Sequence, residues 1–257
     1  MGKWKVNNKW HKHQILSGDP VLAPYLPQTK LFNETNVQQL LDDFSKIIIK
    51  PVKGSAGKGI IIVTEHAPQS YEVCTFNKTY TFKIREELVH YLSKKVSGSQ
   101  AYLIQQYIPL LTINGRNVDF RFITQRKGLR HDWSITGKYA RVAEPNVAIT
   151  NFSLGSSIYT VDEALENSTL IAPPSDVLKR LDETTVSISS CLTRCFHYHL
   201  IWGCDLALDK EGNMWIIEVN SAPQTQGFLE KKALHPMAAA IEKMKKHNKK
   251  SKRSSSG

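Results

Sequence analysis

Long apolar runs, internal repeats and a dense set of cysteines are all missing from this chain of 257 residues. No stretch approaches the ~18 consecutive apolar residues of a membrane span, and the basic N-terminal segment lacks the apolar region of a signal peptide. No segment repeats at a period of about 20 to 50 residues, which excludes solenoids and propellers. We therefore expect a cytoplasmic protein that does not contact a membrane.

Cysteine is too scarce for a disulfide-stapled fold, and the few thiols fit a reducing compartment. The cysteines are Cys74, Cys191, Cys195 and Cys204. The spacing of Cys191 and Cys195 to His197 and His199 is compatible with a zinc site. The two cysteines also continue a helical apolar stripe, however, and cysteine is commonly buried. We favour reduced thiols in the core over a metal site.

The formal net charge of +11 is concentrated at the two ends of the chain. Residues 242–257 contribute +6 and residues 1–13 contribute +4, which leaves +1 for the body. Because the body is nearly neutral, we expect no basic face for nucleic acid, and we rank nucleic acid last among partners. We expect residues 242–257 to form a disordered basic tail whose partner, if any, is acidic.

Strand and helix patterns alternate along the rest of the chain, which predicts an α+β protein. A segment with capping-box spacing at Thr35–Gln38 opens an apolar-periodic run and predicts a short helix. Further helices are predicted at 85–95 and 176–200. Strands are predicted at 46–50, 60–63, 71–76, 79–84, 102–108, 118–125, 133–142, 202–208 and 214–220.

The last two predicted strands form a hairpin whose register follows from its loop. A four-residue loop places Asp205 opposite Glu218 and Leu206 opposite Ile217, with Asn220 on the face of the carboxylates. Carboxylates held opposite each other repel, and neither strand supplies a Lys or Arg. Because a divalent cation would relieve this repulsion, the pattern predicts a Mg²⁺ site. The alternative is a solvated hairpin edge with incidental acids.

A glycine-rich segment, K-P-V-K-G-S-A-G-K-G, begins at Lys50. Its glycines can bring backbone N–H groups close to phosphate oxygens, and its lysines can neutralise phosphate charge. The glycine spacing and the strand that follows exclude a Walker A loop, and the order of the glycines differs from that of protein kinases. We expect a phosphate-binding hairpin loop; a plain flexible turn is the alternative.

Together these segments resemble the ATP-grasp fold, and within it the YheC/YheD-like proteins of endospore-forming bacteria, which are described as coat-associated. The resemblance covers roughly residues 9 to 230. The matching pieces are K-W-H-K-H (9–13), Y-L-P-Q-T (25–29), residues 50–59, Q-Q-Y-I-P (105–109), V-D-F-R (118–121), R-V (141–142) followed by T-N (150–151), and E-V-N-S-A-P (218–223).

The resemblance implies an α+β fold in which two α/β lobes clasp a nucleotide. A small lobe with the glycine-rich loop would cover residues 31–108 and a large lobe with the Mg²⁺ site residues 109–241, flanked by an N-terminal segment (1–30) and the basic tail (242–257). About 30 residues precede the first lobe, where an α/β domain usually stands. We therefore expect the fold without the usual full N-terminal domain.

The resemblance also implies roles for individual residues. The nucleotide-binding residues that it implies are Lys9, Lys50, Gly54, Ser55, Gly57, Gly59, Gln105, Gln106, Ile108 and Asp119. The magnesium ligands that it implies are Asp205, Glu218 and Asn220. Arg121 and Arg141 correspond to cations that stabilise the γ-phosphate or an acyl phosphate. Each arginine also has a second interpretation, as a structural ion-pair partner.

The implied activity is ATP-dependent ligation with Mg²⁺. A small-molecule or peptide carboxylate attacks the γ-phosphate, and an amine then displaces phosphate from the acyl phosphate. The alternative is a non-catalytic protein that acts in spore-coat assembly through its basic ends. The expected location is therefore the cytoplasm or the spore.

Overall fold

The computed structural model describes residues 5–54, 57–75, 78–98, 100–145 and 155–254, apart from the side chains of 251–254. The chain divides into a smaller unit, residues 8–10 and 27–108, and a larger unit, residues 1–7, 11–26 and 109–257. The boundary between Ile108 and Pro109 is the one expected between the lobes. The expected N-terminal segment, however, is shared by the two units, because residues 29–31 pair in the smaller sheet while Leu16 and Leu22 are buried in the larger core.

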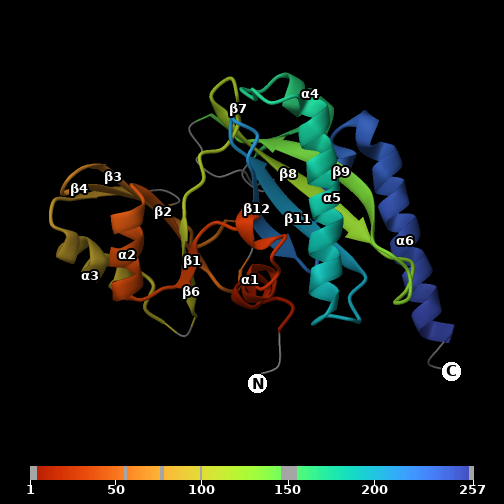
Figure 1. The fold of residues 1–257 in the computed structure, drawn as a ribbon, viewed down its shortest axis with the longest axis horizontal. Coiled ribbons are helices and arrows are strands. Elements are labelled where there is room, and N and C mark those ends of the chain that lie inside the picture. Colours follow the sequence, from red (N-terminus) through yellow and green to blue (C-terminus); the bar gives the residue numbers. More distant parts are fainter. Residues whose placement is uncertain (1–4, 55–56, 76–77, 99, 146–154, 255–257) are drawn as a thin grey trace. The chain divides into compact units, whose positions relative to one another are not determined.

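The smaller unit is an antiparallel sheet in the order β1-β6-β2-β3-β4-β5 (Figure 1). Its strands are β1 (Thr29–Leu31), β2 (Lys46–Pro51), β3 (Ile61–Ala67), β4 (Ser70–Cys74), β5 (Thr79–Phe82) and β6 (Tyr102–Gln106). Helices α2 (Glu34–Asp43) and α3 (Arg85–Lys95) supply apolar stripes that pack with the isoleucines of β2 in one core. The cap of α2 is Asn33, whose side chain accepts a hydrogen bond from the Asn36 N–H at 2.7 Å, and not Thr35 as the capping-box spacing suggested.

The larger unit contains a second antiparallel sheet in the order β10-β9-β8-β11-β12, with β7 paired to β8. Its strands are β7 (Thr112–Ile113), β8 (Arg116–Gln125), β9 (Ser134–Val142), β10 (Ser157–Tyr159), β11 (Ile201–Leu208) and β12 (Met214–Asn220). Its helices are α1 (Lys9–Ser17, of which the first two residues count with the smaller unit), η1 (Ala23–Tyr25), α4 (Val161–Glu166), α5 (Pro174–Thr193), η3 (Gln226–Leu229), η4 (Lys232–Leu234) and α6 (His235–Ser254).

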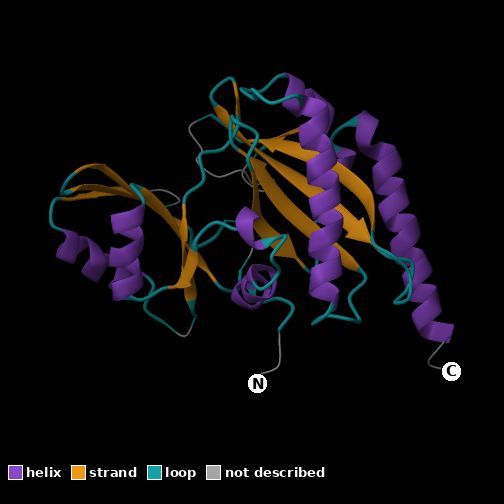
Figure 2. Ribbon diagram, in the orientation of Figure 1, coloured by secondary structure: helices purple, strands orange, loops and turns teal. Residues whose placement is uncertain are grey.

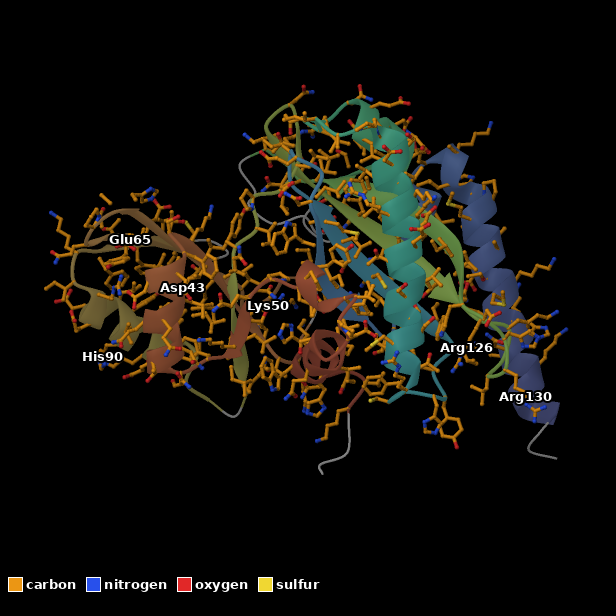
Figure 3. The ribbon with its side chains drawn as sticks, in the orientation of Figure 1. Asp43, Lys50, Glu65, His90, Arg126 and Arg130 are labelled. Carbon is orange, nitrogen blue, oxygen red and sulfur yellow. The ribbon has the colours of Figure 1, made fainter. Side chains whose placement is uncertain are left out.

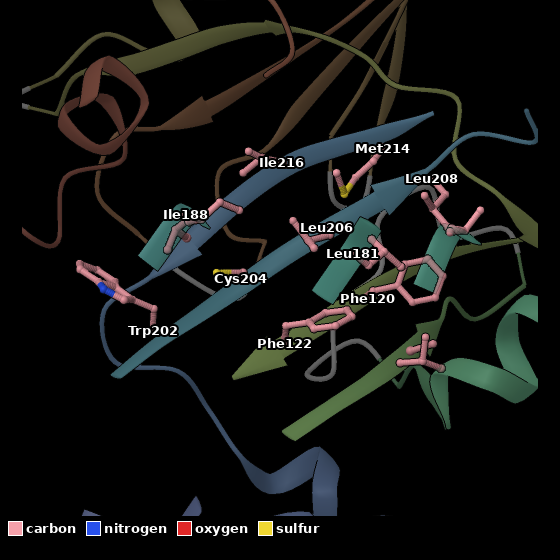
Figure 4. Close-up of a cluster of buried hydrophobic side chains, with 14 of the residues drawn as sticks. Phe120, Phe122, Leu181, Ile188, Trp202, Cys204, Leu206, Leu208, Met214 and Ile216 are labelled. Carbon is pink, nitrogen blue, oxygen red and sulfur yellow. The ribbon is translucent and has the colours of Figure 1, made fainter. Parts of the chain in front are cut away.

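Helices cover both faces of the larger sheet (Figure 2). On one face, Phe120 and Phe122 of β8 pack with Leu181 and Ile188 of α5 (Figure 4). On the other face, Ile123 of β8 packs in a separate cluster with residues of η3 and α6. Because side chains alternate along a strand, the residues next to Phe120 and Phe122 point away from α5. This alternation puts Asp119 and Arg121 on the same face as α6.

Helix α5 ends at Thr193, seven residues before the predicted end of the helix at 200. Apolar periodicity continues to Phe196, which packs against Trp202. The backbone has nevertheless left the helix, because Arg126 binds the carbonyl oxygens of both His197 and His199. Such carbonyls would otherwise accept bonds within a helix. In the same helix Cys191 is buried in the core, as the apolar stripe predicts, and burial raises the pKa of its thiol to about 11.

The prediction of a disordered tail is wrong for residues 242–254, which continue helix α6. A stripe at Met237, Ile241, Met244 and Asn248 faces the body, and Ile241 is fully buried. The Asn248 side-chain amide donates a hydrogen bond to the Arg126 carbonyl at 3.0 Å (Figure 3 labels Arg126 beside α6). Lysines occupy the remaining faces of the helix. Because they outnumber the apolar residues, the composition of this segment did not reveal the short apolar stripe. Across the part of the chain that the structure describes, no helix has the length and apolar character to cross a membrane.

Candidate active site

Four charged side chains meet on the face of the larger sheet that lies opposite α5. Strand register brings Asp119 of β8 opposite Arg141 of β9, and Arg121 of β8 opposite Asp205 of β11. All four side chains are buried, with 5 to 7% of their surface exposed. Each of these side chains therefore faces an opposite charge on the adjacent strand, an arrangement that favours ion pairs.

Each arginine in this cluster makes a paired contact with a carboxylate. Arg141 donates from Nε to Asp119 Oδ1 at 2.7 Å and from Nη2 to Asp119 Oδ2 at 2.5 Å. It also reaches Asp205 Oδ1 from Nη2 at 3.0 Å. Arg121 donates from Nε and Nη2 to the two oxygens of Asp205 at 2.5 and 3.0 Å. The fork geometry fixes both guanidinium planes. The result confirms the second interpretation of the arginines, as ion-pair partners, without deciding the first.

The electrostatic balance favours the ionised form of every member whose pKa is shifted. Burial alone would raise the pKa of Asp205, but the guanidinium groups of Arg121 and Arg141 hold it below its usual value. Burial opposes the charge on the arginines, yet the neighbouring aspartates raise the pKa of both. Burial raises the pKa of Tyr139, which lies opposite Arg121 on β9. Asp205, Arg121 and Arg141 therefore stay charged at neutral pH, whereas the raised pKa of Tyr139 favours its neutral form.

The two carboxylates predicted to face each other do so: Asp205 lies opposite Glu218. The predicted register is wrong nearer the loop, where Leu206 lies opposite Ile216 and not Ile217. A β-bulge between the two positions absorbs one residue and restores the register at Asp205. The bulge also keeps Ile216 and Val219 in the core, so the apolar face is preserved on both sides of the irregularity.

Neither strand of the hairpin supplies a Lys or Arg, as expected, but Arg121 of β8 and Arg141 of β9 contact Asp205 and offset its charge. The residue types suit Mg²⁺, but each oxygen of Asp205 already accepts two hydrogen bonds, so a cation would have to replace some of them. Asp205 and Glu218 supply carboxylate oxygens, and Asn220 Nδ2 donates to Asp205 Oδ2 at 3.0 Å, which directs its amide oxygen elsewhere. Hard oxygen donors of this kind suit Mg²⁺, which usually completes its shell with water and phosphate. Within the described residues no three His, Cys, Asp or Glu side chains form a metal-binding group, so a cation would also need such additional ligands.

In the smaller unit, Lys50 stands near the end of β2 with only 8% of its surface exposed (Figure 3). Its Nζ donates a hydrogen bond to Gln105 Oε1 on β6 at 2.7 Å. Gln105 in turn contacts Thr29 on β1. The predicted phosphate lysine and the predicted hinge glutamine therefore belong to one hydrogen-bonded group, which sequence inspection did not suggest.

The glycine-rich segment joins β2 to β3, as predicted. Gly57 and Gly59 adopt φ angles of 71° and 75°, a left-handed conformation that side-chain-bearing residues rarely take. Lys9 lies beside this segment, because its Nζ donates to the Gly54 carbonyl at 2.7 Å and its N–H to the Val52 carbonyl. Ser55 lies outside the described residues.

The predicted hinge residues end the smaller unit. Gln106 is the last residue of β6, and its backbone N–H donates to the Gln28 carbonyl at 2.9 Å. Ile108 is buried and precedes Pro109, where the larger unit resumes. Sequence reasoning missed Thr29 and Tyr139, which contact predicted site residues across strands. Thr29 ends the family-like piece Y-L-P-Q-T, but no motif gives it or Tyr139 a role; the strand pairing shows what each residue lies against.

Two solved structures resemble this chain in their fold. D-alanine–D-alanine ligase from Bacillus anthracis superposes with a TM-score of 0.53 at 15% identity, over 96% of this chain and 69% of that chain. D-cycloserine synthetase DcsG gives a TM-score of 0.54 at 10% identity, over 93% and 70%. At such identities the likeness concerns the fold alone.

The chain belongs to the YheC/D-like ATP-grasp family, whose profile matches residues 1–247. Endospore coat-associated protein YheD of Bacillus subtilis (strain 168) is 28% identical over 84% of this chain, and the YheC protein of that strain is 26% identical over 88%. Because these matches cover 48% and 61% of the two relatives, the chain spans about half the length of the curated relatives that it matches. The coenzyme γ-F420-2:α-L-glutamate ligase of Methanococcus maripaludis is 30% identical over 52% of this chain and 38% of that protein.

Proposed function

We propose that this chain binds Mg-ATP and ligates a carboxylate to an amine through an acyl phosphate. The observation that carries the proposal is the sheet face on which Asp205 lies opposite Glu218, with Arg121 and Arg141 fixed beside them. Oxygen ligands for a cation and preorganised guanidinium groups are what phosphoryl transfer to a carboxylate requires. Membership of the ATP-grasp family and the printed activity of the glutamate ligase relative support this choice.

In this proposal the smaller unit holds the nucleotide. Lys50 and the N–H groups around Gly57 and Gly59 contact the phosphates, and Lys9 closes on the same segment through Gly54. The backbone of residues 105–108 contacts adenine. Positive charge and backbone donors on a short hairpin suit a polyphosphate, since both can approach its oxygens closely.

The larger unit supplies the metal ligands. Asp205, Glu218 and Asn220 hold Mg²⁺ together with phosphate oxygens of the nucleotide. When bound, Mg²⁺ offsets the negative charge that gathers on the transferred phosphoryl group. Strand pairing puts Asp205 opposite Glu218, and Asn220 follows two residues later on β12, so the fold brings the three proposed ligands to one face of the sheet.

The arginines act on the reacting groups. A substrate carboxylate oxygen attacks the γ-phosphorus as the bond to ADP breaks, and an amine then attacks the acyl carbon, loses a proton and expels phosphate. Arg121 and Arg141 donate to phosphoryl oxygens during both steps. Asp119 accepts two bonds from Arg141, which supports a role in orienting this arginine. The ribose contact that the resemblance implies stays a prediction.

A non-catalytic role linked to the spore coat is the second candidate, because two relatives carry that description in their names. Helix α6 would serve this role, since it exposes lysines at 243, 246 and 249 to an acidic partner. This candidate needs neither Mg²⁺ ligands nor the arginine cluster to act on phosphate.

The deciding experiment measures ADP release by the purified chain with Mg-ATP and pools of amino acids and peptides. We expect release that depends on both a carboxylate and an amine, with the ligated product identified by mass spectrometry. Hydroxylamine in place of the amine should yield a hydroxamate. Nucleotide binding without any carboxylate-dependent ADP release would favour the coat-linked role.

A further inference from the structure

We propose that Thr29 is a positioning residue that aims the Lys50 ammonium, acting through Gln105. This inference rests on the proposed function, because Lys50 matters here as a ligand of the nucleotide phosphates. A chain of hydrogen bonds in the smaller unit carries it. Lys50 Nζ donates to Gln105 Oε1 at 2.7 Å, Gln105 Nε2 donates to Thr29 Oγ1 at 2.6 Å, and Thr29 Oγ1 donates to the Pro27 carbonyl at 2.8 Å.

The Thr29 hydroxyl determines which atom donates and which accepts in each of these hydrogen bonds. A hydroxyl has one proton, and Thr29 gives it to the Pro27 carbonyl, which can only accept. Thr29 Oγ1 must therefore accept from Gln105, so the amide nitrogen of Gln105 faces Thr29. The amide oxygen of Gln105 then faces Lys50, whose ammonium can only donate. A single backbone carbonyl thus sets the orientation of the amide.

Strand pairing holds the three side chains in line. Thr29 of β1 lies opposite Gln105 of β6, and Gln105 lies opposite Ile48 of β2, two residues before Lys50. Alternation along β2 puts Lys50 on the face of Ile48, diagonal to Gln105. Because each of the three side chains is at most 9% exposed, water cannot readily replace a lost partner.

Loss of the Thr29 hydroxyl should therefore act at Lys50. Without that acceptor, the Gln105 amide nitrogen loses its buried partner on β1, and Lys50 alone orients the amide. A rotated amide would present its N–H₂ group to the ammonium, two donors facing each other. Lys50 would then adopt other rotamers, and its charge would spend less time where the phosphates bind.

The experiment compares the dissociation constants of Mg-ATP and adenosine by calorimetry for wild type and Thr29 variants. Thr29→Val keeps the shape but removes the hydroxyl, and we expect a loss of about tenfold in ATP affinity. Adenosine has no phosphates, so its affinity should change less than about twofold. Thr29→Ser, which restores the hydroxyl, should recover ATP affinity. Thr64→Val on β3, outside the hydrogen-bonded chain, is the matched control.

A double-mutant cycle with Lys50→Met tests whether Thr29 acts through Lys50. In the Lys50→Met background, Thr29→Val should cause no further loss of ATP affinity. Additive losses, or equal losses for ATP and adenosine, would reduce Thr29 to a structural residue and overturn the proposal. If the Thr29→Val variant does not fold, Thr29→Ala, which also lacks the hydroxyl, takes its place. A wild type that binds neither ligand contradicts the proposed function itself, whereas normal ATP binding by Thr29→Val contradicts only the role of Thr29.

Discussion

Arg141 holds two carboxylates at once, because its guanidinium group contacts both Asp119 and Asp205. Within the sheet this contact links β8, β9 and β11 through side chains as well as through backbone bonds. Removal of one member would leave buried negative charge without its partner, which costs far more than the net gain from forming the pair. An alanine substitution at Arg141 would therefore lower stability as well as any activity, so a charge-preserving variant is needed to distinguish the two effects.

Arg141→Ala should lower the free energy of unfolding by about 3–5 kcal/mol, since two buried carboxylates lose their shared partner. Arg141→Lys keeps the charge but loses the two-pronged contact, so its loss should be smaller. Denaturant unfolding followed by circular dichroism measures both. Arg130→Ala, at an exposed turn position, is the control and should change stability little. Equal stability of the Arg141→Ala and Arg130→Ala variants would mean that the cluster is not a structural centre.

The depressed pKa of Asp205 predicts how stability depends on pH. Its carboxyl is more acidic in the folded than in the unfolded chain, so its contribution is fully present above the unfolded pKa of about 3.9. That contribution is lost as pH falls through the lower, folded pKa, when protonation breaks the contacts with Arg121 and Arg141. Stability measured between pH 7 and pH 3 should therefore fall below about pH 4. In Asp205→Asn this part of the acid loss should vanish; an unchanged acid profile would contradict the assignment.

At the scale of elements, helix α6 shows how a few contacts can order a segment that is mostly charged. Ile241 is fully buried, and Asn248 donates to the Arg126 carbonyl near the far end of the helix. Arg126 itself binds carbonyl oxygens of the loop after α5, so this arginine connects three separate segments. The end of α6 is thus part of the fold of the larger unit.

Truncation after Ile241 should lower the melting temperature by about 4–8 °C, because it removes the half-buried Met244 and the buried Asn248 with its hydrogen bond to Arg126. Removal of residues 255–257 alone is the control and should have no effect. Differential scanning calorimetry of the two truncated chains makes the comparison. If both melt like the full chain, the C-terminal half of α6 contributes nothing to the body and acts only through its charges.

For the molecule as a whole, the proposed function predicts that nucleotide binding depends on Mg²⁺. Mg-ATP should raise the melting temperature more than ATP with EDTA, because a ligand stabilises the folded state in proportion to its binding. Glu218→Gln should remove most of the difference that Mg²⁺ makes. Lys50→Met should reduce the shift with and without Mg²⁺, since it acts on the phosphates and not on the cation. Thermal shift assays at fixed ATP concentration measure all of these effects.

Two outcomes would contradict this expectation. An equal thermal shift with Mg²⁺ and with EDTA would mean that Asp205, Glu218 and Asn220 hold no cation. A Lys50→Met variant that binds ATP like wild type would mean that Lys50 is only a buried strand residue bonded to Gln105.

Local pattern in the sequence was sufficient for much of the fold. Apolar alternation identified the main strands, and the family motifs identified the ATP-grasp fold that the comparisons support. Counting residues outward from a four-residue loop correctly placed Asp205 opposite Glu218. The count failed nearer the loop, where the bulge shifts the partner of Leu206 from Ile217 to Ile216. A bulge depends on packing of both faces at once, so counting residues from a loop cannot reveal it.

Contacts between residues far apart in the chain were decided only by tertiary structure. Arg121 neutralises Asp205 because the sheet order puts β8 beside β11, 84 residues away. Thr29 reaches Gln105 across 76 residues, and Asn248 reaches Arg126 across 122. The sequence by itself determined most of the longer strands, helices α2, α3 and α5, and the candidate ligands, because these follow from patterns within a few residues. Which charge meets which, and whether a basic segment finds a surface to pack on, depends on the order in which strands assemble, and local spacing does not encode that order.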